Sequence, residues 1–234
     1  MKKIVLLVFL SLICVYVFAA GIKEPTKFDP TVTPVEGEWI NFDPNYNVLK
    51  FKFTGNRWEF TYRDVYLTGL FNYNNKEVLF TNENGKWTQG YEFKGSYRFF
   101  IPEMGYKGRV QTYAWGYFTK QPYGDLVRSY LTKEKLFSDI VTNENELARI
   151  QGSWKSNYNN GRVVYTFSGD RFTVNAPGKR LVTGTVKIRD NVLYLIVTDE
   201  QFGMFYLDFS PDNKIFLNEL WSYFDLWWGE FIKQ

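Results

Sequence analysis

The heptapeptide Trp115-Gly116-Tyr117-Phe118-Thr119-Lys120-Gln121 reveals an internal repeat, because the last seven residues of the chain nearly match it. Residues 228–234 read Trp-Gly-Glu-Phe-Ile-Lys-Gln, which is identical at five of seven positions and lies 113 residues later. A match of this length is not expected by chance in a chain of 234 residues. The sequence therefore predicts one domain written twice.

Two further landmarks recur in the same order. Gly37-Glu38-Trp39 corresponds to Gly152-Ser153-Trp154, and residues 53–57 correspond to residues 167–171, with offsets of 115 and 114. This period is too long for a solenoid repeat but long enough for a small domain. We expect tandem domains at residues 36–121 and 151–234. The sequence leaves open whether the copies form two barrels or one, although each copy's own opening Trp and closing Lys favour separate barrels.

The N-terminus has the three-part form of a secretory signal. Lys2 and Lys3 precede an apolar run over residues 4–17, and small residues follow at Ala19 and Ala20. Residues 1–20 are therefore predicted to be a signal peptide, and the proline-containing residues 21–35 an extended tether. An uncleaved anchor is one alternative, although the run is short for a bilayer. Lipidation at Cys14 is another, and the residues around it fit a lipidation signal poorly.

The composition narrows the class of protein. Cys14 is the only cysteine and the chain contains no histidine. Without Lys2 and Lys3 the charge is nearly balanced, with 26 basic and 25 acidic residues, which gives no support for nucleic-acid binding. Export without disulfides is common for bacterial envelope proteins. We therefore expect a periplasmic or extracellular protein. A transmembrane barrel is not favoured, because the predicted strands are short and carry charges on both faces.

Each copy reads as a meander of about eight short strands. Residues 48–54 alternate between apolar and polar positions, which is typical of a half-buried strand. Gly55-Asn56 predicts a turn, and Trp58, Phe60 and Tyr62 would share one face of the next strand. Further strands are predicted at residues 65–72, 76–81 and 111–120, with Asn84-Gly85 as the strongest hairpin signal.

The second copy repeats this pattern. Strands are predicted at residues 163–167, 171–176, 181–188, 192–197 and 202–209, with turns at residues 169–170 and 190–191. Residues 220–228 are apolar on both faces, so we expect them to be covered by the barrel core on one side and by the neighbouring copy on the other. The fold class predicted is all-β, with two small antiparallel meander barrels.

Residues 122–150 form a connector with helical character. Leu136 and Ile140 have helical i, i+4 spacing, and residues 143–146 have the form of a capping box. Leu147 and Ile150 would form the apolar face of a short helix. This helix would end just before the second copy and cover one end of its barrel.

These features together resemble the lipocalins, and more closely the short lipocalin-like domains of exported bacterial proteins in the calycin superfamily. The resemblance rests on Gly-X-Trp in the first strand, the meander, and a basic residue near the end of the last strand. It implies that Trp39 pairs with Lys120, and Trp154 with Lys233, as a structural clasp at the closed end of each barrel. A cation over an indole face contributes about 0.5 to 1 kcal/mol when exposed. Here each copy is about half the usual lipocalin length, and Lys stands where Arg is usual.

The residues offer little for catalysis. Histidine is lacking and the only cysteine lies in the predicted signal, so no Ser-His or Cys-His pair and no imidazole or thiolate metal site is expected. Four carboxylates lie in or near apolar sequence, where burial raises a pKa, but no spacing pairs them: Asp208, Glu219, Asp225 and Glu230. We expect no enzyme, no cofactor and no metal.

Aromatic residues make up 20% of the chain and serve either as core or as the wall of a ligand site. The strand pattern gives the following candidates for cavity-facing ligand contacts: Trp58, Phe60, Tyr62, Tyr113, Trp115, Phe172, Tyr194, Tyr206 and Trp221. The leading expectation is a non-catalytic exported protein that binds a small apolar or amphipathic ligand. The alternatives are a module that binds carbohydrate or envelope protein through exposed aromatics, and a domain pair that supports envelope assembly without a ligand.

Overall fold

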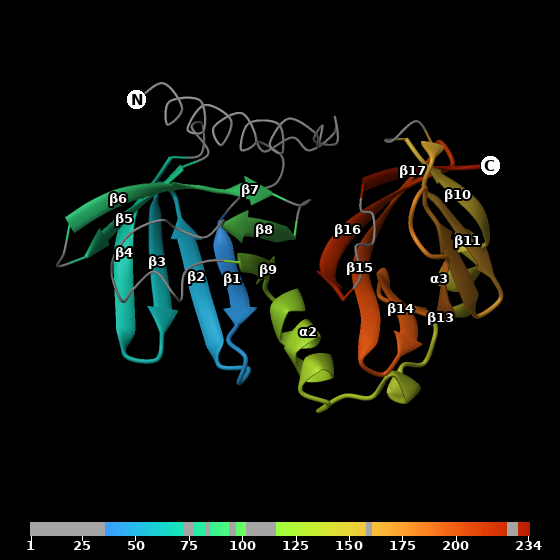
Figure 1. Cartoon of the computed structure of the whole chain (residues 1–234), viewed down its shortest axis with the longest axis horizontal. Coiled ribbons are helices and arrows are strands. Elements are labelled where there is room, and N and C mark those ends of the chain that lie inside the picture. Colours follow the sequence, from blue (N-terminus) through green and yellow to red (C-terminus); the bar gives the residue numbers. More distant parts are fainter. Residues whose placement is uncertain are drawn as a thin grey trace, which may run out of the picture.

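The computed structural model describes residues 36–72, 77–82, 85–93, 97–101, 116–157, 161–223 and 229–234. The predicted signal peptide and tether, with Cys14, lie outside the described residues. The described chain is mostly β and contains two antiparallel sheets, a half-barrel followed by a closed barrel (Figure 1). The predicted all-β fold class is confirmed.

The first sheet has the order β6-β5-β4-β3-β2-β1-β9-β8-β7. Its strands are β1 (Gly37–Phe42), β2 (Val48–Thr54), β3 (Arg57–Tyr62), β4 (Val65–Asn72), β5 (Glu77–Asn82), β6 (Gly85–Gly90), β7 (Glu92–Phe93), β8 (Arg98–Ile101) and β9 (Gly116–Lys120). The two edge strands, β6 and β7, are consecutive along the chain and are separated only by Tyr91. One stretch of chain therefore pairs with β5 at one end and with β8 at the other.

The second sheet is a closed barrel in which each strand pairs with the next, and β17 returns to β10. Its strands are β10 (Gly152–Ser156), β11 (Val164–Ser168), β12 (Arg171–Asn175), β13 (Val182–Arg189), β14 (Val192–Thr198), β15 (Gln201–Ser210), β16 (Lys214–Ser222) and β17 (Gly229–Lys233). If β6 and β7 are counted as one bent strand, the described residues of each copy contain eight strands in the same order.

The registers of the closing strands align the two copies residue by residue. Ile101 of β8 pairs with Gly116, and Leu217 of β16 pairs with Gly229. Arg98 lies three residues before the first of these pairs and Lys214 three residues before the second. Arg98 and Lys214 are therefore equivalent positions of the repeat, on β8 and on β16.

Turns join the strands where small or polar residues permit a left-handed backbone. Gly55 and Gly169 both have positive φ at the equivalent β2–β3 and β11–β12 turns. Asp190 and Asn191 have φ of 55° and 60°, which suits a tight hairpin of right-handed twist. The hairpin predicted near Asn84-Gly85 joins β5 and β6, where Gly85 belongs to β6 and pairs with Asn82, whereas Asn84 lies outside the described residues.

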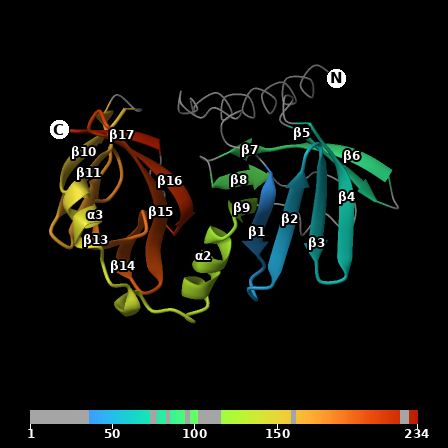
Figure 2. The ribbon, with the colours of Figure 1, turned by 180° about the vertical axis from the view of Figure 1, so that it is seen from behind.

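The connector contains three helical segments, α2 (Tyr123–Leu131), the 3-10 helix η1 (Phe137–Asp139) and α3 (Glu144–Ile150). Helix α2 lies between the two sheets and contacts β1, β9 and β16 (Figures 1 and 2). Leu136 precedes the 3-10 helix and is exposed, so its predicted helical pairing with Ile140 is wrong.

Helix α3 begins as the sequence predicts, but its capping box is only half formed. The Asn143 side chain accepts hydrogen bonds from the backbone N–H groups of Asn145 and Glu146. The Glu146 carboxylate instead accepts from the backbone N–H of Asn191, at 3.3 Å, because the Asn143 N–H already donates to a barrel carbonyl. The helix is thus tied to the β13–β14 hairpin.

Candidate functional site

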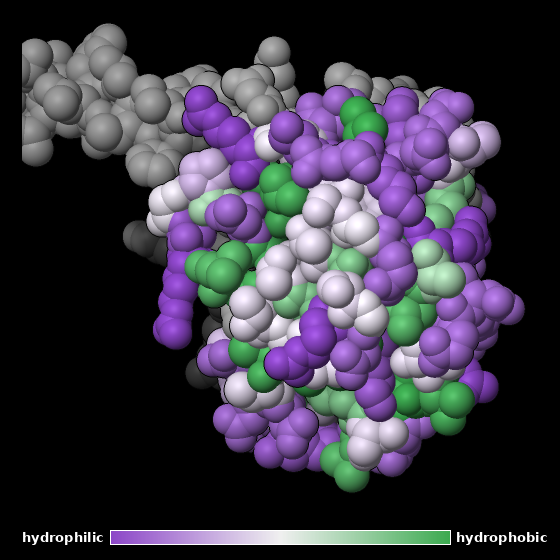
Figure 3. Space-filling view, turned by 90° about the vertical axis from the view of Figure 1, so that its right-hand side faces the viewer, coloured by the Kyte–Doolittle hydropathy of each residue, from purple (hydrophilic) through white to green (hydrophobic). Residues whose placement is uncertain are grey.

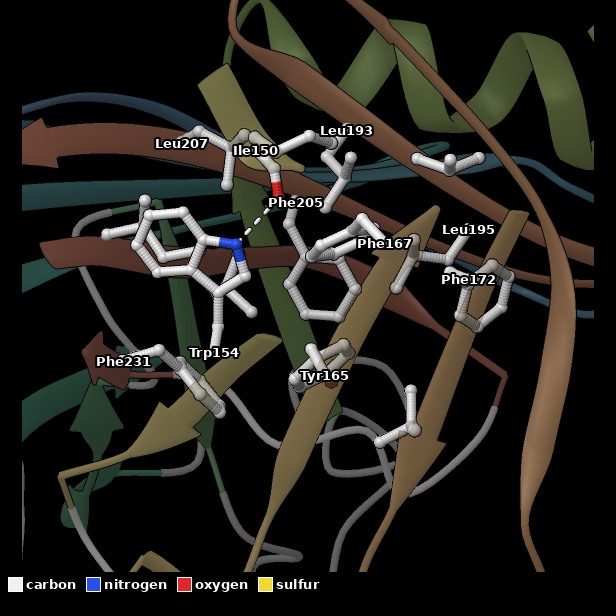
Figure 4. Packing of buried hydrophobic residues seen from close by; sticks show 14 of the residues in the cluster. Ile150, Trp154, Tyr165, Phe167, Phe172, Leu193, Leu195, Phe205, Leu207 and Phe231 are labelled. Atoms are coloured by element: carbon white, nitrogen blue, oxygen red, sulfur yellow. Dashed lines mark hydrogen bonds between the residues drawn. The ribbon is translucent and has the colours of Figure 1, made fainter. Parts of the chain in front are cut away.

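The interior of the closed barrel is filled by apolar side chains. Trp154 is buried in this core and donates from Nε1 to the carbonyl oxygen of Ile150 at 2.6 Å, so that α3 and β10 are joined within the core. Figure 4 shows this bond and the rings of Tyr165, Phe205 and Phe231 around the indole. Tyr165 and Phe231 meet edge to face, with ring centres 5.1 Å apart.

The first sheet packs a similar aromatic core. Phe51 contacts the rings of Trp58, Phe60 and Phe118, with centroid distances of 5.7, 4.9 and 4.9 Å. All four side chains are buried. The concave face of the sheet is therefore occupied by its own side chains.

The structure brings together the residues of both predicted clasps. Lys120 pairs with Trp39 across β9 and β1, and Lys233 pairs with Trp154 across β17 and β10. The lysine Nζ atoms lie 5.4 Å and 5.3 Å from the respective indole rings. Burial lowers the pKa of Lys120.

Four of the candidate ligand residues belong to the packed cores. Trp58, Phe60 and Tyr62 lie in the core of the first sheet, and Phe172 lies in that of the barrel. The Trp58 indole N–H donates to the carbonyl oxygens of Leu70 and Leu79 at 3.1 and 2.9 Å. Trp58, Phe60 and Phe172 therefore pack within the cores and are not accessible to a ligand.

Three others lie on the outer face of the barrel and not toward its interior. Tyr194, Tyr206 and Trp221 belong to, or pack against, a cluster in which the connector covers β14, β15 and β16. Both faces of these strands are apolar because both are covered, so alternation alone did not indicate which face is interior. Tyr113 and Trp115 lie outside the described residues.

A groove of about 1160 Å³ lies between the two copies. It is bounded by the β1–β2 turn, the ends of β3, β8 and β9, helix α2, and the outer face of β15 and β16. Two of the predicted ligand residues, Tyr62 and Trp221, line it. Its aromatic lining consists of Phe42, Tyr46, Tyr62, Tyr117, Tyr130, Phe202, Trp221 and Tyr223.

A buried arginine lies at the groove and joins the two copies. Arg98, from β8, forms an ion pair with Glu219 of β16, and only 5% of its side chain is exposed. Its guanidinium carbon lies 4.1 Å from the ring centre of Tyr117 and 5.7 Å from that of Trp221. Burial lowers the pKa of Arg98 to about 10, against a smaller opposing effect of Tyr117, so the side chain is protonated at neutral pH.

Polar and aromatic contacts extend the junction beyond the groove. The Thr119 hydroxyl of β9 donates to the carbonyl oxygen of Leu220 at 2.8 Å. Tyr97, Tyr123 and Tyr206 pack as a triad with ring centres 4.9 to 5.3 Å apart. Burial raises the pKa of Tyr123 to about 12, and that of Tyr97 is raised for the same reason.

The rim of the groove contains a partly buried, hydrogen-bonded carboxylate. Asp43 accepts hydrogen bonds from Asn47 and from the Tyr62 hydroxyl, the latter at 2.7 Å, and pairs with Arg63 at 3.2 Å. The hydrogen bond from Asn47 makes the largest contribution to holding the pKa of Asp43 well below its usual value, although desolvation opposes it. The carboxylate therefore fixes Tyr62 and the β1–β2 turn.

The carboxylates noted in the sequence have different partners. Asp208 accepts from Asn218 at 2.7 Å, and burial raises its pKa against this bond. Glu219 pairs with Arg98, whereas Glu230 accepts from Asn157 at 2.7 Å. Asp225 is not among the described residues. Within the described ranges, no group of three or more Asp, Glu, Cys or His side chains is placed to hold a metal ion.

The chain matches no protein-family model, no curated protein and no solved structure. Among the residues that the structure describes, no helix has the length and apolar character needed to cross a bilayer. The side of the barrel that faces away from the first sheet carries hydrophobic side chains scattered among hydrophilic ones (Figure 3).

Proposed function

We propose that this chain is a non-catalytic, exported, lipocalin-like protein that binds one small amphipathic ligand in the groove between its two copies. The observation that carries the proposal is the groove itself. Its volume of about 1160 Å³ suits a small organic molecule, and its walls combine aromatic faces with tyrosine hydroxyls. The packed interiors of the two sheets favour this groove over either barrel lumen as the binding site.

The charge of the lining favours a ligand without a large net charge. Three cations and three anions line the groove, which balances the charge at its surface. Two of the cations are paired within this region, because Arg63 contacts Asp43 and Lys133 lies 3.5 Å from Glu200. An amphipathic molecule with an apolar body and a neutral or zwitterionic head fits these walls better than a polyanion.

The proposal of a lipocalin-like module rests on the repeated clasp, and the proposal of export rests on residues 1–20. N-terminal sequencing of protein isolated from its own host tests export, with a mature chain that begins at residue 20 or 21 as the expected result. Acylated Cys14 at the N-terminus would instead make it a lipoprotein.

Native mass spectrometry of protein purified from its own host tests ligand binding. We expect a bound species of a few hundred daltons that is released on unfolding. Ser222→Trp places a large side chain in the groove and should abolish the bound species, whereas Ser168→Trp, at the exposed last residue of β11, should retain it. Loss of the species in both variants, or in neither, would place the ligand elsewhere.

A second candidate function is supported by exposed tyrosines at the rim. Tyr46, Tyr117 and Tyr223 line the groove and are 38%, 40% and 61% exposed. Aromatic rings with polar tips are suited to sugar rings, whose apolar faces stack while their hydroxyls hydrogen-bond. Quenching of tryptophan fluorescence by soluble oligosaccharides, without an effect of fatty acids, would favour a carbohydrate-binding module.

A further inference from the structure

Two buried N–H donors at the groove have no hydrogen-bond partner. Within the described part of the chain, the buried side-chain nitrogens without a partner are Nε of Arg98 and Nε1 of Trp221. Both side chains line the groove, and the guanidinium carbon lies 5.7 Å from the centre of the Trp221 ring. A buried donor that lacks an acceptor is costly and rare in folded proteins, so a pair at one cavity requires an explanation.

The charge state of Arg98 restricts the acceptor. The guanidinium is already neutralised by Glu219, which pairs with it through another of its nitrogens, Nη1. A second anion at this point would be buried without its own cation, which is strongly unfavourable. Both nitrogens are covered by neighbouring atoms, so a ligand oxygen reaches either of them after a small side-chain shift, and a neutral oxygen then accepts without adding charge. Carbonyl and hydroxyl oxygens meet this requirement.

The aromatic neighbours restrict the rest of the ligand. Tyr117 lies against the guanidinium at 4.1 Å, and Trp221 and Phe202 belong to the wall on the barrel side. Apolar or aromatic groups of a ligand would bury surface against these rings while its oxygen reaches the donors. The site thus combines two hydrogen-bond donors with an apolar wall.

We propose that Arg98 Nε and Trp221 Nε1 form a subsite for a neutral oxygen acceptor, so that the groove selects ligands with a carbonyl or hydroxyl group attached to an apolar body. This inference rests on the proposed function and specifies its ligand class. In this proposal, two donors on different copies of the repeat orient the ligand, one on β8 and one on β16.

Three probes of nearly equal size separate the alternatives. The probes are 2-acetylnaphthalene with a neutral carbonyl, 2-naphthoate with a carboxylate, and 2-ethylnaphthalene with no oxygen. Binding to the mature full-length protein is measured by calorimetry. The wild-type protein is compared with Trp221→Phe, which removes one donor and keeps an aromatic ring, and with Tyr66→Phe, an exposed control outside the groove.

We expect Trp221→Phe to weaken binding of 2-acetylnaphthalene roughly two- to tenfold, the effect of one lost hydrogen bond, and to change binding of 2-ethylnaphthalene by less than twofold. Tyr66→Phe should change neither. In ¹⁵N-labelled wild-type protein, 2-acetylnaphthalene should also shift the indole N–H signal of Trp221, and this measurement does not depend on folding of the variant.

Each other outcome overturns a distinct part of the argument. Equal losses for both neutral probes, with no shift of the indole signal, would refute the acceptor subsite while leaving ligand binding in the groove intact. Tightest binding by 2-naphthoate would show that the subsite takes anions and would refute neutral selection. If none of the three probes binds, both the subsite and the proposed groove function fail.

Discussion

Replacing Arg98 with methionine should lower the free energy of unfolding by about 3 to 5 kcal/mol, the range for breaking a buried ion pair from one side. The variant leaves the Glu219 carboxylate, which is only 12% exposed, without its cation. Methionine is shorter than arginine, but its unbranched and adaptable side chain fills much of the same space, which limits the cavity left by the substitution. The loss of the guanidinium over Tyr117 adds to the effect, since a desolvated cation–π contact contributes about 2 kcal/mol or more.

Urea unfolding, followed by both tryptophan fluorescence and circular dichroism, measures this effect. The double variant Arg98→Met with Glu219→Met should recover stability to within about 1 kcal/mol of wild type, because removing both charges also removes their desolvation cost. Lys133→Met is the matched control. Its ion pair with Glu200 is largely exposed, so its loss should change stability by less than about 1 kcal/mol.

Two results would refute this reasoning. A loss below about 1 kcal/mol for Arg98→Met would mean that Glu219 remains solvated or finds another partner. A double variant as unstable as the single variant would mean that the ion pair itself, rather than the stranded carboxylate, supplies the stability. Either result would also weaken the view that the two copies are held together at this point.

Three further predictions follow from local geometry. Asn143→Ala removes the side-chain cap of α3 and should cost about 0.5 to 2 kcal/mol in urea unfolding, whereas Asn143→Asp should retain most of the stability. Gly184→Ala should cost about 1 to 3 kcal/mol by thermal unfolding, because the added methyl would lie 2.2 Å from the carbonyl oxygen of Ile196 and 2.7 Å from the Phe172 ring; a neutral result would show that β13 and β14 separate easily. Folding lowers the pKa of Asp43, so the unfolded chain binds a proton at this carboxylate more readily than the folded chain does. The carboxylate therefore stabilises the fold at pH values above its ordinary pKa of 3.8, and this stabilisation declines as the pH falls below 3.8. Asp43→Asn should therefore lower the unfolding midpoint at pH 7 and have a smaller effect at pH 3, and an effect of equal size at both pH values would contradict this origin.

The strand pattern of this chain could be predicted well from the sequence, because most strands have one buried face. The predicted strand at residues 48–54 coincides with β2, and that at residues 65–72 coincides with β4. In β3, Trp58, Phe60 and Tyr62 are all buried, as their alternation predicts. Local alternation and turn residues were sufficient here, since most strands pair with their neighbours in sequence.

The site was harder to predict, because it depends on contacts between the copies. Arg98 and Glu219 are 121 residues apart, and no local pattern pairs them. A signal was nevertheless present, since each charge lies inside an otherwise apolar strand, where an isolated charge would be very unfavourable. The sequence singled out Glu219 for this reason but not Arg98. The alternation of side chains along the strands gave the wrong face for Tyr194 and Tyr206. The connector covers the outer face of the barrel there, so that the outer face is as apolar as the inner one.

The equivalence of Arg98 and Lys214 limits how many copies can assemble in this way. A contact between unlike surfaces of a repeated unit can in principle continue head to tail into a filament, because each added copy offers the same free surface again. Here the second copy does not offer it. Lys214 is only partly buried and lies 3.8 Å from the Glu230 carboxylate of its own barrel. The position equivalent to Glu230 in the first copy is Tyr117. The second copy therefore holds its equivalent cation within its own barrel and does not present the ion-pair donor with which Arg98 of the first copy reaches its neighbour.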